Sequence, residues 1–246
     1  MLISKAKLKD LQYFLDNYGR DDDYLLDIGC ADGSAYYSLR KGLEKNFKYF
    51  GIDYPYWEAE GKEIKLKKAP EMSYVKGDAY HLPFSDDSFD LVTITHVLEH
   101  LQNITRCLEE VRRVSKEEGH ILIIVPLQGN NIPGILFRNR NPYSHFKEKI
   151  NHNDPIVTGH PQKKTYDQFF EIFNKFFEFS ESYSRGGLKM LLYILLNPNL
   201  KHIEHLLQQE NLTQKIFQNT LTQSWIKKTD FIKLIGTYIL TPSKDN

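Results

Sequence analysis

Five times along the first half of the chain, a short apolar run alternates with a segment of helical composition. The runs are residues 24–28, 47–52, 72–75, 89–95 and 120–126. They lack the polar alternation of a half-exposed strand, and therefore predict strands that are buried on both faces. Such alternation is typical of a parallel sheet covered by helices on both sides. Right-handed crossovers bring the carboxyl ends of the strands to one edge, where sheets of this kind bind ligands.

The intervening segments complete a doubly wound α/β fold. Helices are predicted over residues 3–17, 34–45, 103–116 and 166–176, and two closing strands over residues 177–183 and 234–240. Five apolar residues share one face of the third helix, with Gly119 as its C-terminal stop: Ile104, Cys107, Leu108, Val111 and Val114. We therefore predict one mostly parallel, seven-stranded sheet.

The 246 residues are enough for one sizeable core and few for two domains, so a single domain over residues 1–246 is expected. Its ligand-binding core is predicted at residues 24–126. Residues 127–165 form an irregular connection, which is usually functional in a compact domain, and residues 188–230 are a predicted helical insertion before the last strand.

The turn after the first predicted strand carries small residues at Gly29, Ala31 and Gly33, in the segment LLDIGCADGS. Small side chains let the backbone of a strand-to-helix turn approach a ligand closely. A nicotinamide or flavin fingerprint would place glycines at positions 29, 31 and 34, and a P-loop would place a lysine after its last glycine. This turn does neither, which disfavours both readings.

Acidic residues stand at the ends of the next two strands. Asp53 follows Gly33 by twenty residues, and Asp78 follows the third strand. A carboxylate at the end of the second strand can accept hydrogen bonds from both hydroxyls of a ribose and would repel a 2′-phosphate. The sequence therefore predicts a nucleoside with a free ribose at this edge.

Taken together, these motifs resemble those of the class I S-adenosylmethionine-dependent methyltransferases, which have a Rossmann-like fold. Asp27, Gly29 and Gly33 match the first motif of that family, with Cys30 and Ala31 inside it. The stretch VKGDAYHLPFSDDSFDLV, residues 75–92, is similar to the ubiquinone and menaquinone biosynthesis type. The resemblance covers residues 24–126 and implies S-adenosylmethionine as the cofactor.

The resemblance also implies a role for each matching residue. Asp53 would bind the ribose, Tyr54 would flank the adenine, and Asp78 and the Ala79 amide would bind the adenine edge. In the segment THVLEHL, His96 would lie beside the methionine part of the cofactor, and Glu99 and His100 would begin a helix. His96 and His100 would then share a helical face, but capping is favoured over metal binding, and no metal is expected.

A methyl acceptor of high pKa needs a base to take its proton, whereas an ionised acceptor needs none. His100 at the cofactor edge is the candidate base, and His145, His152 and His160 are alternatives in the irregular connection. The apolar run of residues 188–196 could line an acceptor pocket, form a lid, dock on a membrane surface or join two copies, although a buried core helix is the favoured reading.

The composition of the chain limits the kinds of partner that it is expected to bind. Basic and acidic residues each number 32, so no global positive field would concentrate nucleic acid. No apolar stretch has the length of a membrane span or a signal peptide, and the two cysteines suit a reducing compartment, so cytoplasm is expected. We expect a small-molecule or lipid-linked acceptor, with peripheral membrane contact possible and the oligomeric state undetermined. A non-catalytic S-adenosylmethionine-binding regulator or scaffold is the main alternative, and a nucleotide-dependent oxidoreductase is the third.

Overall fold

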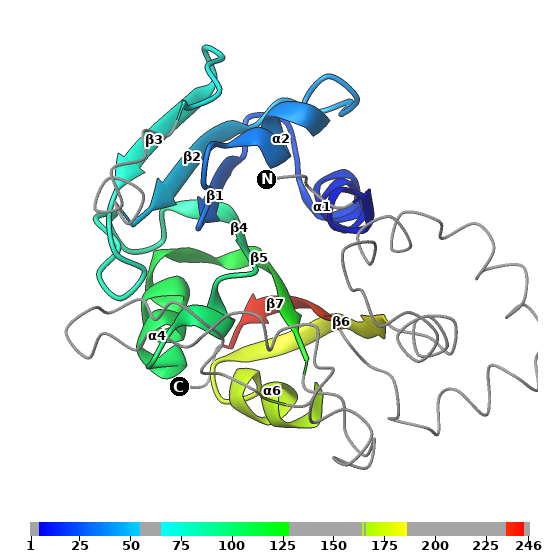
Figure 1. Ribbon diagram of the computed structural model, residues 1–246, viewed down its shortest axis with the longest axis vertical. Coiled ribbons are helices and arrows are strands. Elements are labelled where there is room, and N and C mark those ends of the chain that lie inside the picture. The colour runs from blue at the N-terminus through cyan, green and yellow to red at the C-terminus, as the bar shows by residue number, and fades with distance from the viewer. Residues whose placement is uncertain (1–4, 55–64, 128–163, 165, 186–234, 244–246) are drawn as a thin grey trace, which may run out of the picture.

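The computed structural model describes residues 5–54, 65–127, 164, 166–185 and 235–243, and Figure 1 shows their arrangement. The strands form one seven-stranded sheet in the order β3-β2-β1-β4-β5-β7-β6. Its elements, in chain order, are α1 Lys5–Tyr18, β1 Tyr24–Ile28, α2 Ser34–Leu39, β2 Lys48–Asp53, β3 Met72–Lys76, β4 Phe89–Thr95, the 3₁₀ helix η1 Leu98–His100, α4 Ile104–Val114, β5 Ser115–Pro126, α6 Tyr166–Phe173, β6 Phe177–Arg185 and β7 Ile235–Pro242.

The first five strands are parallel to one another, whereas β7 is antiparallel to both β5 and β6. The predicted mostly parallel, seven-stranded sheet is therefore confirmed. The order reverses between β1 and β4, because the chain builds outward to β3 and then returns to the other side of β1. Open α/β sheets bind their ligands at the carboxyl ends of the strands, beside such a reversal.

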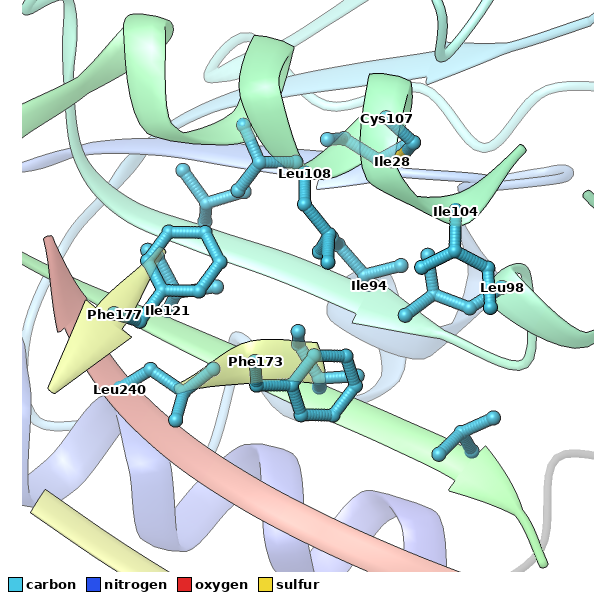
Figure 2. Close-up of a cluster of buried hydrophobic side chains, with 14 of the residues drawn as sticks. Ile28, Ile94, Leu98, Ile104, Cys107, Leu108, Ile121, Phe173, Phe177 and Leu240 are labelled. Atoms are coloured by element: carbon cyan, nitrogen blue, oxygen red, sulfur yellow. The ribbon is translucent and has the colours of Figure 1, made fainter. Parts of the chain in front are cut away.

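Two apolar layers enclose the sheet. Helices α4 and α6 pack on one face, and α1 and α2 pack on the other (Figure 1). Figure 2 shows the first layer, in which Cys107 and Leu108 of α4 and Phe173 of α6 meet Ile94 and Ile121 of the central strands. All five predicted apolar residues of α4 are buried, as the helical spacing indicated. Burial of this kind contributes about 25 cal/mol per Å² of apolar surface.

The ends of two helices differ from the prediction. The helix expected over residues 34–45 ends at Leu39, and the Gly42 amide donates to the Leu39 carbonyl in the tight turn that follows. Helix α4 ends at Val114, because the backbone of Ser115 is already extended and Ser115 pairs with Phe89. Gly119 therefore lies inside β5 rather than at a helix stop, and that prediction was wrong.

Several predictions fall outside the described residues. They concern residues 128–163, with His145, His152 and His160, and the insertion at residues 188–230. Within the described part of the chain, helices fall short of the length and apolar character that crossing a bilayer requires.

Candidate cofactor site at the carboxyl edge of the sheet

The pairing registers bring the predicted site residues to one edge. Ile28 at the end of β1 is paired with Ile52 of β2 and with Ile94 of β4, and Asp53 is paired with Lys76 at the end of β3. The Gly77 amide also donates to the Asp53 carbonyl at 3.0 Å. The turns that follow β1, β2, β3 and β4 are therefore neighbours, as the sequence predicted.

The turn after β1 is tightly wound. Gly29 and Gly33 have φ values of 74° and 72°, and Ala31 between them has a φ of 49°. A Cβ atom on Gly29 would overlap the side chain of Val97, which follows β4. Glycine at position 29 thus lets the turn after β4 pack directly against the turn after β1.

The backbone amides of this turn are bound to the end of β2. The amides of Gly29 and Cys30 both donate to the Ile52 carbonyl, at 2.8 and 3.2 Å. The Ala31 amide donates to Oδ2 of Asp53 at 2.6 Å. Burial raises the pKa of the Asp53 carboxyl, and its hydrogen bonds from the Ala31 and Tyr54 amides act in the opposite direction. Asp53 therefore both shapes the first turn and presents a carboxylate at the end of β2.

Asp27, the acidic residue of the first motif, is buried beneath the turn. Its Oδ1 accepts a hydrogen bond from the Thr93 hydroxyl and its Oδ2 accepts one from the Tyr49 hydroxyl, both at 2.9 Å. Burial raises the pKa of the Asp27 carboxyl, whereas Lys7 and the two hydroxyls favour its charged form. Both oxygens of Asp27 are thus engaged by the protein's own side chains.

Cys30 is a buried thiol in the same turn. Its Sγ lies 3.7 Å from the Ala31 carbonyl oxygen, to which it donates. Burial, together with the nearby carboxylates of Asp27 and Asp53, raises the pKa of the Cys30 thiol. The protonated sulfur is therefore a poor nucleophile, and Cys30 contributes shape and backbone to the turn.

The turn after β3 presents Asp78 with one oxygen fixed. Its Oδ1 accepts from the Tyr80 amide at 2.9 Å, and its Oδ2 lies 3.9 Å from Nδ1 of His81. The Tyr80 hydroxyl accepts from the Asn103 amide at 3.1 Å, which ties this turn to the start of α4. Ala79 is half-buried against the core beneath α4 and α6.

Sequence reasoning missed the interactions that hold the rest of this segment. Arg113 of α4 forms hydrogen bonds with residues 82–86. The Arg113 guanidinium donates to the carbonyls of Leu82 and Phe84, at 2.9 and 2.7 Å, and to the Asp86 carboxylate at 2.8 Å. It also binds both oxygens of Glu110, and Oε2 of Glu110 accepts from the Leu82 amide at 2.7 Å. The forked guanidinium thus fixes the path of the segment that begins with Asp78.

The turn after β4 corrects one prediction. His96 and His100 do not share a helical face, because His96 has a φ of 59° and precedes a single 3₁₀ turn from Leu98 to His100. The His96 amide donates to the Ile124 carbonyl of β5 at 2.8 Å, and this bond holds the strained residue in place. In the described part of the chain, no group of three or more His, Cys, Asp or Glu residues is arranged to hold a metal ion.

Glu99 in this turn is almost fully buried, with 1% of its side chain exposed. Its Oε1 lies 3.3 Å from Nδ1 of His96, whose side chain is 36% exposed. Its Oε2 is buried and has no hydrogen-bond partner. Sequence reasoning treated Glu99 as a helix-capping residue, and nothing in the sequence pattern distinguishes a cap from a buried carboxylate.

A hollow of about 870 Å³ lies at the opposite edge of the sheet. Arg112, Arg113, Ser115, Lys175 and Ser243 line part of it, together with acidic side chains such as Asp86. These residues lie near the amino ends of β4, β5 and β6, so this hollow is separate from the strand-end turns described above.

The edge that carries Asp53, Asp78 and Glu99 is suited to a ligand rich in hydrogen-bond donors. Carboxylates accept hydrogen bonds only, so they favour hydroxyl, amino and ammonium groups and repel phosphates. Tight turns of small residues allow the ligand to lie close to the backbone. These are the features of a nucleoside site without phosphate.

Comparison with known proteins agrees with this geometry. Residues 26–123 match the methyltransferase domain family. The chain is 30% identical over 112 residues to a demethylmenaquinone methyltransferase of Lactobacillus johnsonii, with 44% of this chain and 46% of that protein covered. It is 30% identical over 152 residues to an uncharacterised protein of Methanocaldococcus jannaschii, with 61% of each chain covered. The chain thus spans about half to three-fifths of the length of these curated relatives.

Among solved structures, the fold resembles a phosphoethanolamine N-methyltransferase of Haemonchus contortus in complex with S-adenosyl-L-methionine. The TM-score is 0.57 at 17% identity, and the match covers 95% of this chain and 52% of that one. This likeness agrees with the sheet order and with the family match. Residues 26–123 are therefore similar to the methyltransferase domain family, and the fold of the chain resembles that of this methyltransferase structure.

Proposed function

We propose that the chain transfers a methyl group from S-adenosylmethionine to a small-molecule or lipid-linked acceptor. The observation that carries the proposal is the set of carboxylates at the ends of successive strands, beside a tight turn of small residues. The comparisons support the class of reaction. We infer the acceptor class and the activity of the whole protein.

The residues at this edge fit S-adenosylmethionine, whose hydroxyl, amino and ammonium groups are all donors. Asp53 would accept from the ribose hydroxyls, and Tyr54 would flank the adenine. Asp78 and the Ala79 amide would bind the adenine edge, and His96 would lie beside the methionine part. When bound, the cofactor supplies an activated methyl group, so the protein's main contribution is to orient the two reactants and exclude water.

Within this proposal, Gly29, Cys30, Ala31 and Gly33 supply backbone close to the ligand, and Asp27 supports them from below. His100, at the end of η1, is the candidate group for accepting a proton from the acceptor. Its amide donates to the Val97 carbonyl, which fixes its backbone at the cofactor edge. An acceptor that is already ionised would need no such base.

The acceptor class is proposed from the relatives and from the chain's charge. The Lactobacillus relative is named for demethylmenaquinone, and the Haemonchus enzyme for phosphoethanolamine. The balance of basic and acidic residues argues against nucleic acid as the acceptor. We therefore place a quinol first among candidate acceptors and an amino alcohol phosphate second.

The test is transfer of a labelled methyl group from S-adenosylmethionine to a reduced demethylmenaquinone, to phosphoethanolamine and to a mixture of small-molecule extracts. Label in any product that depends on intact Asp53 would support the proposal. Tight binding of S-adenosylmethionine without transfer to any fraction would instead favour a regulatory or scaffold role.

A further inference from the structure

Two buried carboxylates lie at the methionine side of the proposed site, and they differ in how they are satisfied. Asp27 has both oxygens bound by hydroxyl groups of Tyr49 and Thr93. Glu99 has one oxygen near His96, and the other, Oε2, is buried without a partner. A buried carboxylate oxygen with no donor is costly, so a donor group of a ligand at this position would be stabilising.

The position of Glu99 ties it to the cofactor turn. It lies in η1 directly after β4, and Val97 two residues earlier occupies the space that a Cβ on Gly29 would need. The His96 amide is anchored to β5, so the turn cannot move away from this position without breaking that bond. Glu99 is therefore held beside the turn that follows β1.

The charge around Glu99 favours a cation. Lys7 of α1 is a half-buried ammonium group that interacts electrostatically with both Asp27 and Glu99. Burial lowers the pKa of Lys7, and these two carboxylates act in the opposite direction. One half-buried ammonium group thus interacts with two buried carboxylates, and a second positive group would balance the charge.

We infer that Oε2 of Glu99 binds the α-ammonium group in the amino-acid part of the cofactor, while Asp27 supports the turn from below. The inference rests on the proposed function and assigns one new contact within it. An ammonium group donates three hydrogen bonds and carries the required charge. His96, through its contact with Oε1, acts as a positioning residue for the carboxylate.

The test measures ligand affinity in a double-mutant-type cycle, in which one change is made in the protein and the other in the ligand. Calorimetric titration would compare wild type and Glu99→Gln with S-adenosylhomocysteine, its analogue lacking the amino group, and 5′-methylthioadenosine. Glu109→Gln on the exposed side of α4 is the matched control. We expect Glu99→Gln to weaken S-adenosylhomocysteine binding by about tenfold to a hundredfold, because a charged hydrogen bond is lost.

The same variant should bind 5′-methylthioadenosine and the deaminated analogue within about twofold of wild type, since the interaction needs both partners. S-adenosylmethionine should lose as much affinity as S-adenosylhomocysteine. A loss confined to S-adenosylmethionine would assign Glu99 to the sulfonium and overturn the inference. An equal loss for 5′-methylthioadenosine would show a purely structural role and would also overturn it.

The comparison of the ligands on wild-type protein alone does not depend on the folding of any variant. If wild type binds S-adenosylhomocysteine and its deaminated analogue equally well, the inference fails although the proposed function stands. If wild type binds neither S-adenosylhomocysteine nor S-adenosylmethionine, the proposed function itself fails.

Discussion

The turns after β1 and β4 are neighbours at one edge of the sheet, yet their polar groups are used differently. In the turn after β1, amides and carboxylates bind one another, as in the contact between Ala31 and Asp53. In the turn after β4, Glu99 keeps a buried oxygen without a partner. The first turn is therefore a rigid support that is complete before ligand binds, and the second contains a group that we expect the ligand to satisfy.

The largest expected effect is at the contact between the two turns. Gly29→Ala should lower the free energy of unfolding by about 2–4 kcal/mol, because φ is positive and the new methyl group overlaps Val97. Gly42→Ala is the control, since a Cβ there would meet only the Leu39 carbonyl at an ordinary 3.6 Å. Urea denaturation would measure both, and adding Val97→Ala should recover part of the Gly29→Ala loss. Equal stability of the two single variants would show that the turns do not meet as described.

The second prediction compares the two carboxylates directly. Asp27→Ala should lower the free energy of unfolding by about 2–3 kcal/mol, because it leaves the Tyr49 and Thr93 hydroxyls buried without acceptors. Glu99→Gln should change stability by less than about 1 kcal/mol, since the lost charge was incompletely satisfied. Denaturation of both variants under the same conditions would check this order. A larger loss of unfolding free energy for Glu99→Gln than for Asp27→Ala would contradict the difference between the two turns.

The third prediction concerns the hydrogen bonds that Arg113 makes with residues 82–86. Arg113→Ala should cost about 1–2 kcal/mol of unfolding free energy, since its hydrogen bonds are charged but partly exposed to solvent. Arg113→Lys should not restore the loss, because an ammonium group cannot bridge the two carbonyls and Glu110 in the same way. Thermal melts would measure stability, with Arg112→Ala as the charge-matched control. A full rescue by lysine would mean that charge alone matters at this position.

The smallest expected effect is on pH dependence. The Arg113 guanidinium holds the pKa of Glu110 below its ordinary value. The stability that this pair contributes is therefore complete above the ordinary glutamate pKa, and it is lost as pH falls toward the lowered folded-state value. Between about pH 7 and about pH 3.5, wild type should lose up to about 1 kcal/mol more than Arg113→Ala. Denaturation measured at several pH values would check this. An equal loss of stability in wild type and Arg113→Ala over this range would contradict the assignment.

Much of this edge could be predicted from the sequence because each strand end carries its own local pattern. Asp53 and Asp78 follow apolar runs directly, and the small residues at positions 29, 31 and 33 mark the tight turn. The buried face of α4 follows from helical spacing alone. These features depend on neighbours in the chain, so periodicity and turn chemistry are sufficient to find them.

The features that were missed depend on residues far apart in the chain. Arg113 binds carbonyls about thirty residues earlier, and the sequence around it looks like an ordinary solvated helix face. The four-residue spacing of His96 and His100 predicted a shared helical face, but the His96 amide donates to Ile124 of β5 and His96 has a left-handed conformation. Both oxygens of Asp27 are engaged by Tyr49 and Thr93, and no local pattern in the sequence reveals these two partners.

The central claim is that the carboxyl edge of the sheet binds S-adenosylmethionine through its strand-end carboxylates. The most direct measurement is calorimetric titration of S-adenosylhomocysteine into wild type and Asp53→Asn, which keeps an oxygen for the Ala31 amide but removes the charge. We expect wild-type binding with a Kd of about micromolar order, weakened at least about tenfold in the variant. Absence of binding by folded wild-type protein, or equal binding by the two proteins, would contradict the account.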